Sequence, residues 1–250
     1  MNTIANPAIS RPSLALLGAE PWRAAFEFLS HKLDTAKPAK QGDGHPVIIF
    51  PGLASDHSAV APLLRHCRAL GYAATDWGRG YNRGPQGDTD EWLQALADDV
   101  RRLLDGSHQR ATLIGWSLGG LYARELGKLL APQVRQVITI GTPFNADRDH
   151  TNVGWLFRLL NGSDPGIDEA LGQRLRQPPP VPTTSIYSRS DGVVAWQTCL
   201  HAPGHEHVQD IEVSGSHIGM AWNRGVLRVL TERLAMHAEP AHLVPSARAS

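Results

Sequence analysis

The chain has 250 residues, enough to bury one substantial hydrophobic core and a common size for a single α/β domain. Lys plus Arg and Asp plus Glu both number 24, so the formal net charge at pH 7 is zero. No basic block is present to neutralise phosphates, and no apolar run approaches the ~18 residues needed to span a bilayer. We therefore expect neither a nucleic-acid partner nor stable insertion in a membrane.

Residues 1–44 are expected to form an amino-terminal extension that contains a docking helix. Pro21 suits the first position of a helix over residues 21–34, because the N–H that proline lacks is unused there. Apolar residues recur at helical spacing on one face of this segment: Trp22, Phe26, Leu29 and Leu33. We expect this apolar stripe to pack on the main domain.

From residue 45 onwards, apolar runs typical of strands alternate with helical patterns. The expected strands cover residues 47–50, 72–76, 111–115 and 134–140, and the expected helices cover residues 57–70, 89–104 and 118–130. This alternation predicts an α/β fold with a mostly parallel central sheet and helices on both of its faces.

The alternation breaks after Gly141. Residues 144–180 carry aromatic residues, glycines and a run of three prolines, and we expect a small cap or lid insertion there. The alternation then resumes with strands near 183–187 and 207–213, a short helix after residue 194 and a final helix near 220–236. The main domain is thus expected over residues 45–236, followed by a disordered tail at 237–250 that is rich in Ala, Pro and Ser.

A Gly-Trp-Ser-Leu-Gly-Gly segment at residues 115–120 directly follows one of the predicted strands. A serine on a sharp turn between a strand and a helix has its hydroxyl exposed, and side chains at Gly115 and Gly119 would crowd that turn. The following helix also directs its first N–H groups and the positive end of its dipole toward the same point. Ser117 is therefore the first candidate for a nucleophile.

A serine nucleophile needs a base, and the base needs a carboxylate to orient it. Asp191 and His217 each follow a predicted strand, at the sheet edge where parallel strands end and functional loops gather. Asp164 and Asp168 are alternative sources of the carboxylate, but they lie within the expected cap. The position of Asp191 at a strand end favours it over both.

With these motifs in place, the chain resembles the α/β-hydrolase superfamily, and within it the compact bacterial serine esterases and lipases. The resemblance covers about residues 45–236 and rests on GWSLGG at 115–120, GTPF at 141–144, YSRSDGVV at 187–194 and GSHIGM at 215–220. It implies that Ser117 is the nucleophile, that His217 is the general base and later the acid, and that Asp191 supports the imidazole.

The resemblance also implies an oxyanion hole made of backbone N–H groups. One donor is expected to be Leu118, the residue after the nucleophile. The other is expected in the loop after the first core strand, which reads Pro-Gly-Leu-Ala-Ser-Asp at 51–56, with Leu53 as the preferred donor. Proline stands here where many relatives have histidine, and the HGGG form of the loop is absent.

A serine nucleophile favours acyl transfer, and carboxylic esters, small or lipid, are the expected substrates, with a preference for short to medium acyl chains. Apolar residues that flank the catalytic and cap segments are candidates for an acyl site: Trp116, Phe144, Trp155, Val193 and Ile218. Core packing is the alternative for some of them. Transfer to an acceptor alcohol or thiol, or a non-catalytic binding role on the same scaffold, stays open.

No metal or cofactor is expected. His201, His205 and His207 lie close together in sequence, but Pro203-Gly204 interrupts them and no companion Cys or Asp cluster follows, which favours surface histidines. Cys67 and Cys199 fit no C-x-x-C or metal-ligand spacing and are expected to be reduced thiols. Residues 14–19 form too short and too poorly flanked an apolar stretch for an export signal, so we expect a cytoplasmic protein.

Overall fold

A parallel β-sheet forms the centre of the computed structural model, which describes residues 9–33, 39–145 and 165–236. Within these residues the sheet has six strands in the order β2-β1-β3-β4-β5-β6, and every neighbouring pair is parallel. The strands are β1 (Pro46–Phe50), β2 (Ala73–Asp76), β3 (Ala111–Trp116), β4 (Val134–Ile140), β5 (Thr183–Tyr187) and β6 (Val208–Glu212). The predicted parallel α/β architecture is confirmed.

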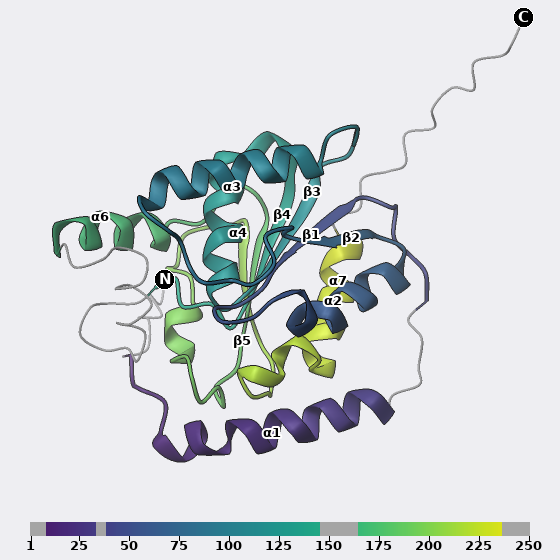
Figure 1. Ribbon diagram of the computed structural model, residues 1–250. Helices are drawn as coiled ribbons and strands as arrows, with labels where there is room; N and C mark the ends of the chain where they lie inside the picture. Colours follow the sequence, from purple (N-terminus) through teal and green to yellow (C-terminus); the bar gives the residue numbers. More distant parts are fainter. Residues whose placement is uncertain (1–8, 34–38, 146–164, 237–250) are drawn as a thin grey trace, which may run out of the picture.

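Helices cover both faces of this sheet (Figure 1). One face carries α3 (Thr89–Leu103), α4 (Leu118–Leu129) and α6 (Pro165–Arg176), and the other carries α2 (His57–Leu70) and α7 (Arg224–Met236). Short 3-10 segments occur at η1 (Ala131–Gln133), η2 (Trp196–Cys199) and η3 (Ile218–Ala221). The remaining helix, α1 (Leu14–Leu33), lies along the bottom of Figure 1, below η3 and outside the two helical layers.

The central strands read as continuous apolar runs because both of their faces are buried. In β1, Ile48 and Phe50 belong to the core beneath α3 and α4, whereas Val47 and Ile49 belong to the core beneath α2 and α7. This alternation follows from the two-residue period of a strand. Polar side chains then set where helices begin: the Asp56 carboxylate, for example, accepts a hydrogen bond from the backbone N–H of Ser58 at the start of α2.

The order of strands creates a switch point between β1 and β3. Within the sheet, β2 lies on one side of β1, and β3 lies on the other side of β1. At the carboxyl ends of the two strands, Phe50 is paired with Gly115. The loop after β1 and the turn after β3 therefore start side by side, at the place where open α/β sheets bind ligands.

The amino-terminal helix differs from its prediction in two respects. It begins at Leu14 and contains Pro21 in its interior, because Ser13 caps it earlier by accepting a hydrogen bond from the N–H of Leu16. The expected docking stripe faces away from the domain: Trp22 is 79% exposed and Phe26 is 72% exposed. The residues that α1 buries are instead Glu20 and Ala24, so polar contacts dominate its docking.

Two parts of the predicted organisation lie outside the described residues. These are the greater part of the expected cap, at 146–164, and the expected disordered tail at 237–250. The carboxyl-terminal part of the predicted cap segment forms α6, which packs on the core of the main domain through Leu171 and Leu175. Among the helices in the described ranges, none combines the length and apolar character needed to cross a bilayer.

Candidate active site

Ser117 occupies a sharp turn between β3 and α4. Its backbone has φ 53° and ψ −121°, a conformation that residues other than glycine rarely adopt. Two hydrogen bonds hold this turn: the Ser117 N–H donates to the carbonyl of Ile140 at 2.8 Å, and the Thr142 hydroxyl donates to the carbonyl of Ser117 at 3.0 Å. A strained backbone that its neighbours hold in this way is characteristic of functional sites.

The glycines around Ser117 permit this turn because the backbone segments touch one another. A β-carbon at Gly115 would collide with the backbone of Gly119, and one at Gly119 would collide with the backbone of Phe50 at the end of β1. The steric role that the sequence suggested for both glycines is therefore observed. Their close approach brings the end of β1 against the turn that carries Ser117.

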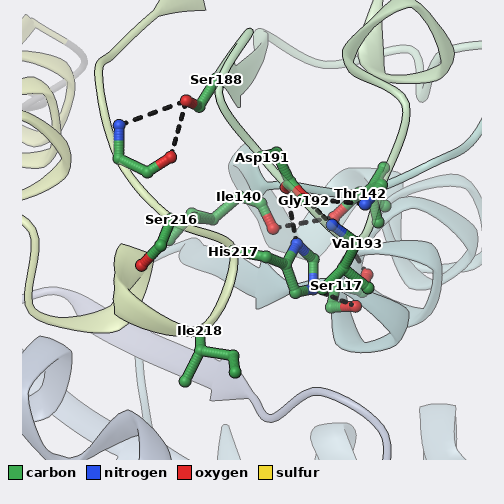
Figure 2. Close-up of polar contacts among 12 residues, drawn as sticks. Ser117, Ile140, Thr142, Ser188, Asp191, Gly192, Val193, Ser216, His217 and Ile218 are labelled. Atoms are coloured by element: carbon green, nitrogen blue, oxygen red, sulfur yellow. Dashed lines mark hydrogen bonds and ion pairs between the residues drawn. The ribbon is translucent and has the colours of Figure 1, made fainter. Parts of the chain in front are cut away.

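The structure brings Ser117, His217 and Asp191 together in one chain of hydrogen bonds (Figure 2). His217 Nε2 lies 3.1 Å from Ser117 Oγ, and His217 Nδ1 lies 2.7 Å from Asp191 Oδ2. A carboxylate can only accept, so Nδ1 carries the proton and Nε2 is free to accept one from the serine hydroxyl. The three side chains come from the ends of β3, β5 and β6, which lie at one edge of the sheet.

Asp191 is fixed by its own loop. Its Oδ1 accepts hydrogen bonds from the N–H groups of Val193 at 2.8 Å and Val194 at 2.7 Å, which leaves Oδ2 for His217. Both Asp191 and His217 are buried. The carboxylate is thus held in place before any substrate arrives, and the imidazole is oriented by it.

The charge of Asp191 also changes the proton affinity of His217. Burial lowers the pKa of His217, but the Asp191 carboxylate raises it through its charge and its hydrogen bond, and Glu20 raises it further. The net effect is a pKa above the usual value of 6.5. A base with this pKa takes up a proton more readily than an isolated imidazole does.

The loop after β1 lies directly against the serine turn. A β-carbon at Gly52 would lie 3.3 Å from the Ser117 β-carbon, so the backbone of this loop approaches the Ser117 side chain closely at Gly52. The next residue, Ala54, has φ 55°, a second strained position beside the site. Leu118 is the first residue of α4, and the N–H at that position has no acceptor within the helix.

Asn82 holds this loop, although no sequence motif marks it as a functional residue. Its side chain is fully buried and donates to the carbonyl of Pro51 at 2.8 Å. Its backbone N–H donates to the Ser55 carbonyl at 2.7 Å, and its own carbonyl accepts from Ala54 at 2.9 Å. Its hydrogen-bond partners are distant in sequence, so no local pattern indicates them.

Replacing Asn82 by alanine is expected to destabilise the fold by about 1–3 kcal/mol, the cost of leaving buried polar groups unpaired. The change removes the hydrogen bonds to Pro51 and Gly84 and the one that the Tyr122 hydroxyl donates to the amide oxygen. Urea unfolding measures the effect. Gln86→Ala, on an exposed side chain of the same segment, should stay within about 0.5 kcal/mol of wild type. Equal unfolding midpoints for both variants would contradict the assigned role of Asn82.

The residues suggested for an acyl site have different surroundings. Trp116 packs beside the His217 ring and donates from Nε1 to the His217 carbonyl at 3.2 Å, and Ile218 is 39% exposed next to His217. Val193 is partly buried beside Asp191. Phe144 is instead a core residue, buried against the Arg124 guanidinium and the His201 ring, as the packing alternative had it. Trp155 lies outside the described residues.

Of the alternative carboxylates, Asp164 lies outside the described residues and Asp168 belongs to α6. His201 is not a surface residue: it is buried, with its ring 2.6 Å from Asp210 and 2.7 Å from Arg124. Asp210 belongs to β6 and Arg124 belongs to α4, so His201 links these two elements inside the fold. Across the described ranges, no three His, Cys, Asp or Glu side chains gather in a group able to hold a metal ion.

Residues 47–245 match the model of the Alpha/beta hydrolase family, and the chain belongs to this family. It is 26% identical over 139 residues to a pimeloyl-[acyl-carrier protein] methyl ester esterase of Shewanella woodyi. That alignment covers 54% of this chain and 52% of the relative, so the chain spans about half the length of the curated relative that it matches.

Solved structures of lipases have the same fold. A Paleococcus ferrophilus monoacylglycerol lipase is similar with a TM-score of 0.57 and 11% identity, over 77% of this chain and 94% of that chain. Aspergillus fumigatus lipase B is similar with a TM-score of 0.59 and 17% identity, over 84% of this chain and 56% of that chain. At these identities the likeness concerns the fold.

Proposed function

We propose that this protein is a serine hydrolase that cleaves carboxylic esters through an acyl-serine intermediate. The observation that carries the proposal is the hydrogen-bonded chain from Ser117 through His217 to Asp191. This arrangement is the one that nucleophilic acyl transfer requires, with a base on the serine hydroxyl and a carboxylate on the base. Membership of the Alpha/beta hydrolase family supports it.

In the proposed reaction, Ser117 Oγ attacks the ester carbonyl while His217 Nε2 takes the hydroxyl proton. The imidazolium then gives this proton to the departing alkoxide, which leaves as an alcohol, and the acyl group stays on Ser117. A water molecule then attacks the acyl-serine while His217 Nε2 takes a proton from it, and the imidazolium gives this water-derived proton to Ser117 Oγ as the acid product leaves. Asp191 stays ionised and stabilises the imidazolium in both halves.

The negative charge that forms on the carbonyl oxygen is assigned to the backbone N–H groups of Leu53 and Leu118. The support for this assignment is the close approach of the Gly52 backbone to Ser117 and the position of Leu118 at the start of α4. Donors on a preformed backbone need no reorganisation during the reaction, and one such donor typically contributes about 100- to 1,000-fold to turnover.

Esters of small or medium acyl groups are the proposed substrates. The relative named as a methyl ester esterase supports carboxylic esters, and Trp116, Val193 and Ile218 are apolar residues next to the catalytic groups. We assign these three residues to the acyl site, whereas Phe144 belongs to the core. Serine chemistry of this type is complete without a metal or a cofactor.

A panel of p-nitrophenyl esters from acetate to palmitate tests the proposal, together with labelling by a fluorophosphonate probe. We expect turnover with an optimum at short or medium chains, and a single label that peptide mapping places on Ser117. Product analysis with an added acceptor alcohol separates hydrolysis from acyl transfer. If the protein shows no turnover and takes no label, that result would contradict the proposal and favour a binding role for the scaffold.

A further inference from the structure

The amino-terminal helix docks on the two loops that carry Asp191 and His217. Its docking face is polar: Glu20 is 1% exposed, although Trp22 and Phe26 on the same helix point to solvent. Trp222, just after η3, donates a hydrogen bond to the carbonyl of Ala24 at 3.1 Å. Figure 1 shows α1 along the side of the molecule where η3 and the start of α7 lie.

Glu20 connects the loop that carries Asp191 to the loop that carries His217. Its Oε1 accepts hydrogen bonds from the N–H of Gly192 at 2.8 Å and from the N–H of His217 at 3.0 Å, and its Oε2 accepts from Ile218 at 3.1 Å. Gly192 adjoins Asp191, so one carboxylate fixes the backbone on both sides of the Asp191–His217 hydrogen bond. Charged acceptors form stronger and shorter hydrogen bonds than neutral ones.

Further contacts of α1 support the same two loops. Arg23 donates to the carbonyl and the hydroxyl of Ser190, the residue before Asp191. Glu27 accepts from the N–H of Ser216, the residue before His217, at 2.8 Å. The backbones also touch, since a β-carbon at Gly192 would lie only 2.5 Å from the carbonyl oxygen of Leu16.

We propose that Glu20 is a positioning residue for the active site, which holds the Asp191 and His217 loops in register from outside the hydrolase domain. This inference rests on the proposed function for the roles of Asp191 and His217. Glu20 does not contact Ser117 or a reacting atom. It therefore acts through the backbone of the loop that carries His217 and through the negative charge of its own carboxylate. The amino-terminal extension thereby becomes part of the catalytic apparatus.

The charge of Glu20 provides a readout that a merely structural contact lacks. In the part of the chain that the structure describes, the charged groups that act on the His217 imidazole are Asp191, from the loop after β5, and Glu20, from α1, and both raise the pKa of His217. Arg23 carries the opposing positive charge 3.8 Å from Glu20. Glu27 lies about one helical turn after Arg23 on α1. Removing the negative charge of Glu20 should therefore lower the pKa of His217.

The test compares the full chain with Glu20→Gln, which keeps the size of the side chain and removes its charge. The His217 imidazole is titrated by NMR, with its signal identified by its loss in His217→Asn. We expect a lower pKa for His217 in Glu20→Gln, a kcat for ester cleavage about 10- to 100-fold lower from the displaced base, and an unchanged KM. Glu20→Asp, which keeps the charge but shortens its reach, should keep more of the pKa effect than of the turnover.

Glu206→Gln removes an exposed carboxylate of the same type and should leave pKa, kcat and KM as in wild type. An unchanged pKa of His217 in Glu20→Gln would overturn the proposal. This holds even if turnover and stability in urea both fell, because a loss of both with an unchanged pKa is what a merely structural contact would produce. The titration needs no ester turnover. If wild type neither cleaves esters nor takes the fluorophosphonate label, the proposed function fails while the test of Glu20 still stands.

Discussion

Replacing Ser117 by alanine is expected to lower kcat for p-nitrophenyl esters by roughly four to six orders of magnitude. The variant loses the oxygen that forms the acyl intermediate, and no other described hydroxyl lies on His217 Nε2. Substrate affinity should change little, because the alanine keeps the backbone of the turn. The measurement is single-turnover kinetics for wild type and variant, with the substrate affinity of each protein obtained from the dependence of its rate on substrate concentration.

Ser107→Ala is the matched control, since it removes an exposed hydroxyl in the loop before β3. It should leave turnover and fluorophosphonate labelling unchanged, whereas Ser117→Ala should abolish labelling. Turnover by Ser117→Ala at the wild-type rate would mean that the observed ester cleavage uses a different group, and it would remove the basis for the mechanism.

Replacing Asp191 by asparagine is expected to lower kcat by about 10⁴-fold while the fold stays intact. The asparagine amide can donate to His217 Nδ1, which would place the imidazole proton on Nε2, where it cannot accept the proton of Ser117. Asp105→Asn, on an exposed loop, should keep wild-type turnover. A loss of less than tenfold in Asp191→Asn would assign the orienting role to another carboxylate.

The pH dependence of kcat/KM should differ between wild type and Asp191→Asn in a defined direction. Ser117 needs a neutral His217, so turnover is present above the pKa of His217 and is lost as the pH falls through it. In wild type this pKa is raised above 6.5 by Asp191 and Glu20. Without the Asp191 charge, burial remains and lowers the pKa of His217, so the acidic limb of kcat/KM should move to lower pH. A shift to higher pH would contradict this electrostatic account.

The sequence by itself was sufficient for the sheet and for the candidate residues at its edge. Short apolar runs and the helical patterns between them are local signals, so β3, β4 and β5 were predicted to within a residue or two. The GWSLGG turn is local as well, since the close contacts of Gly115 and Gly119 follow from a turn of that shape. Asp191 and His217 were named because parallel strands end at one edge.

Local patterns did not determine what a side chain faces. The periodicity of α1 shows an amphipathic helix, but only the structure shows that its apolar stripe points to solvent and that Glu20 points inward. Phe144 and Trp116 both looked like acyl-site candidates. The ring of Phe144 is enclosed by Arg124 and His201, and that of Trp116 lies beside His217.

Long-range hydrogen bonds were out of reach of the sequence for a related reason. Glu20 meets His217 across 197 residues, and Asn82 meets Pro51 across 31. Glutamate in a helix and asparagine in a loop are ordinary surface residues, and neither position carries a motif. The sequence alone determined which local turns and strands can form, because these depend on neighbouring residues. The packing of α1 and of the Asn82 loop decided which polar groups support the site, because hydrogen-bond partners are set by the assembled fold.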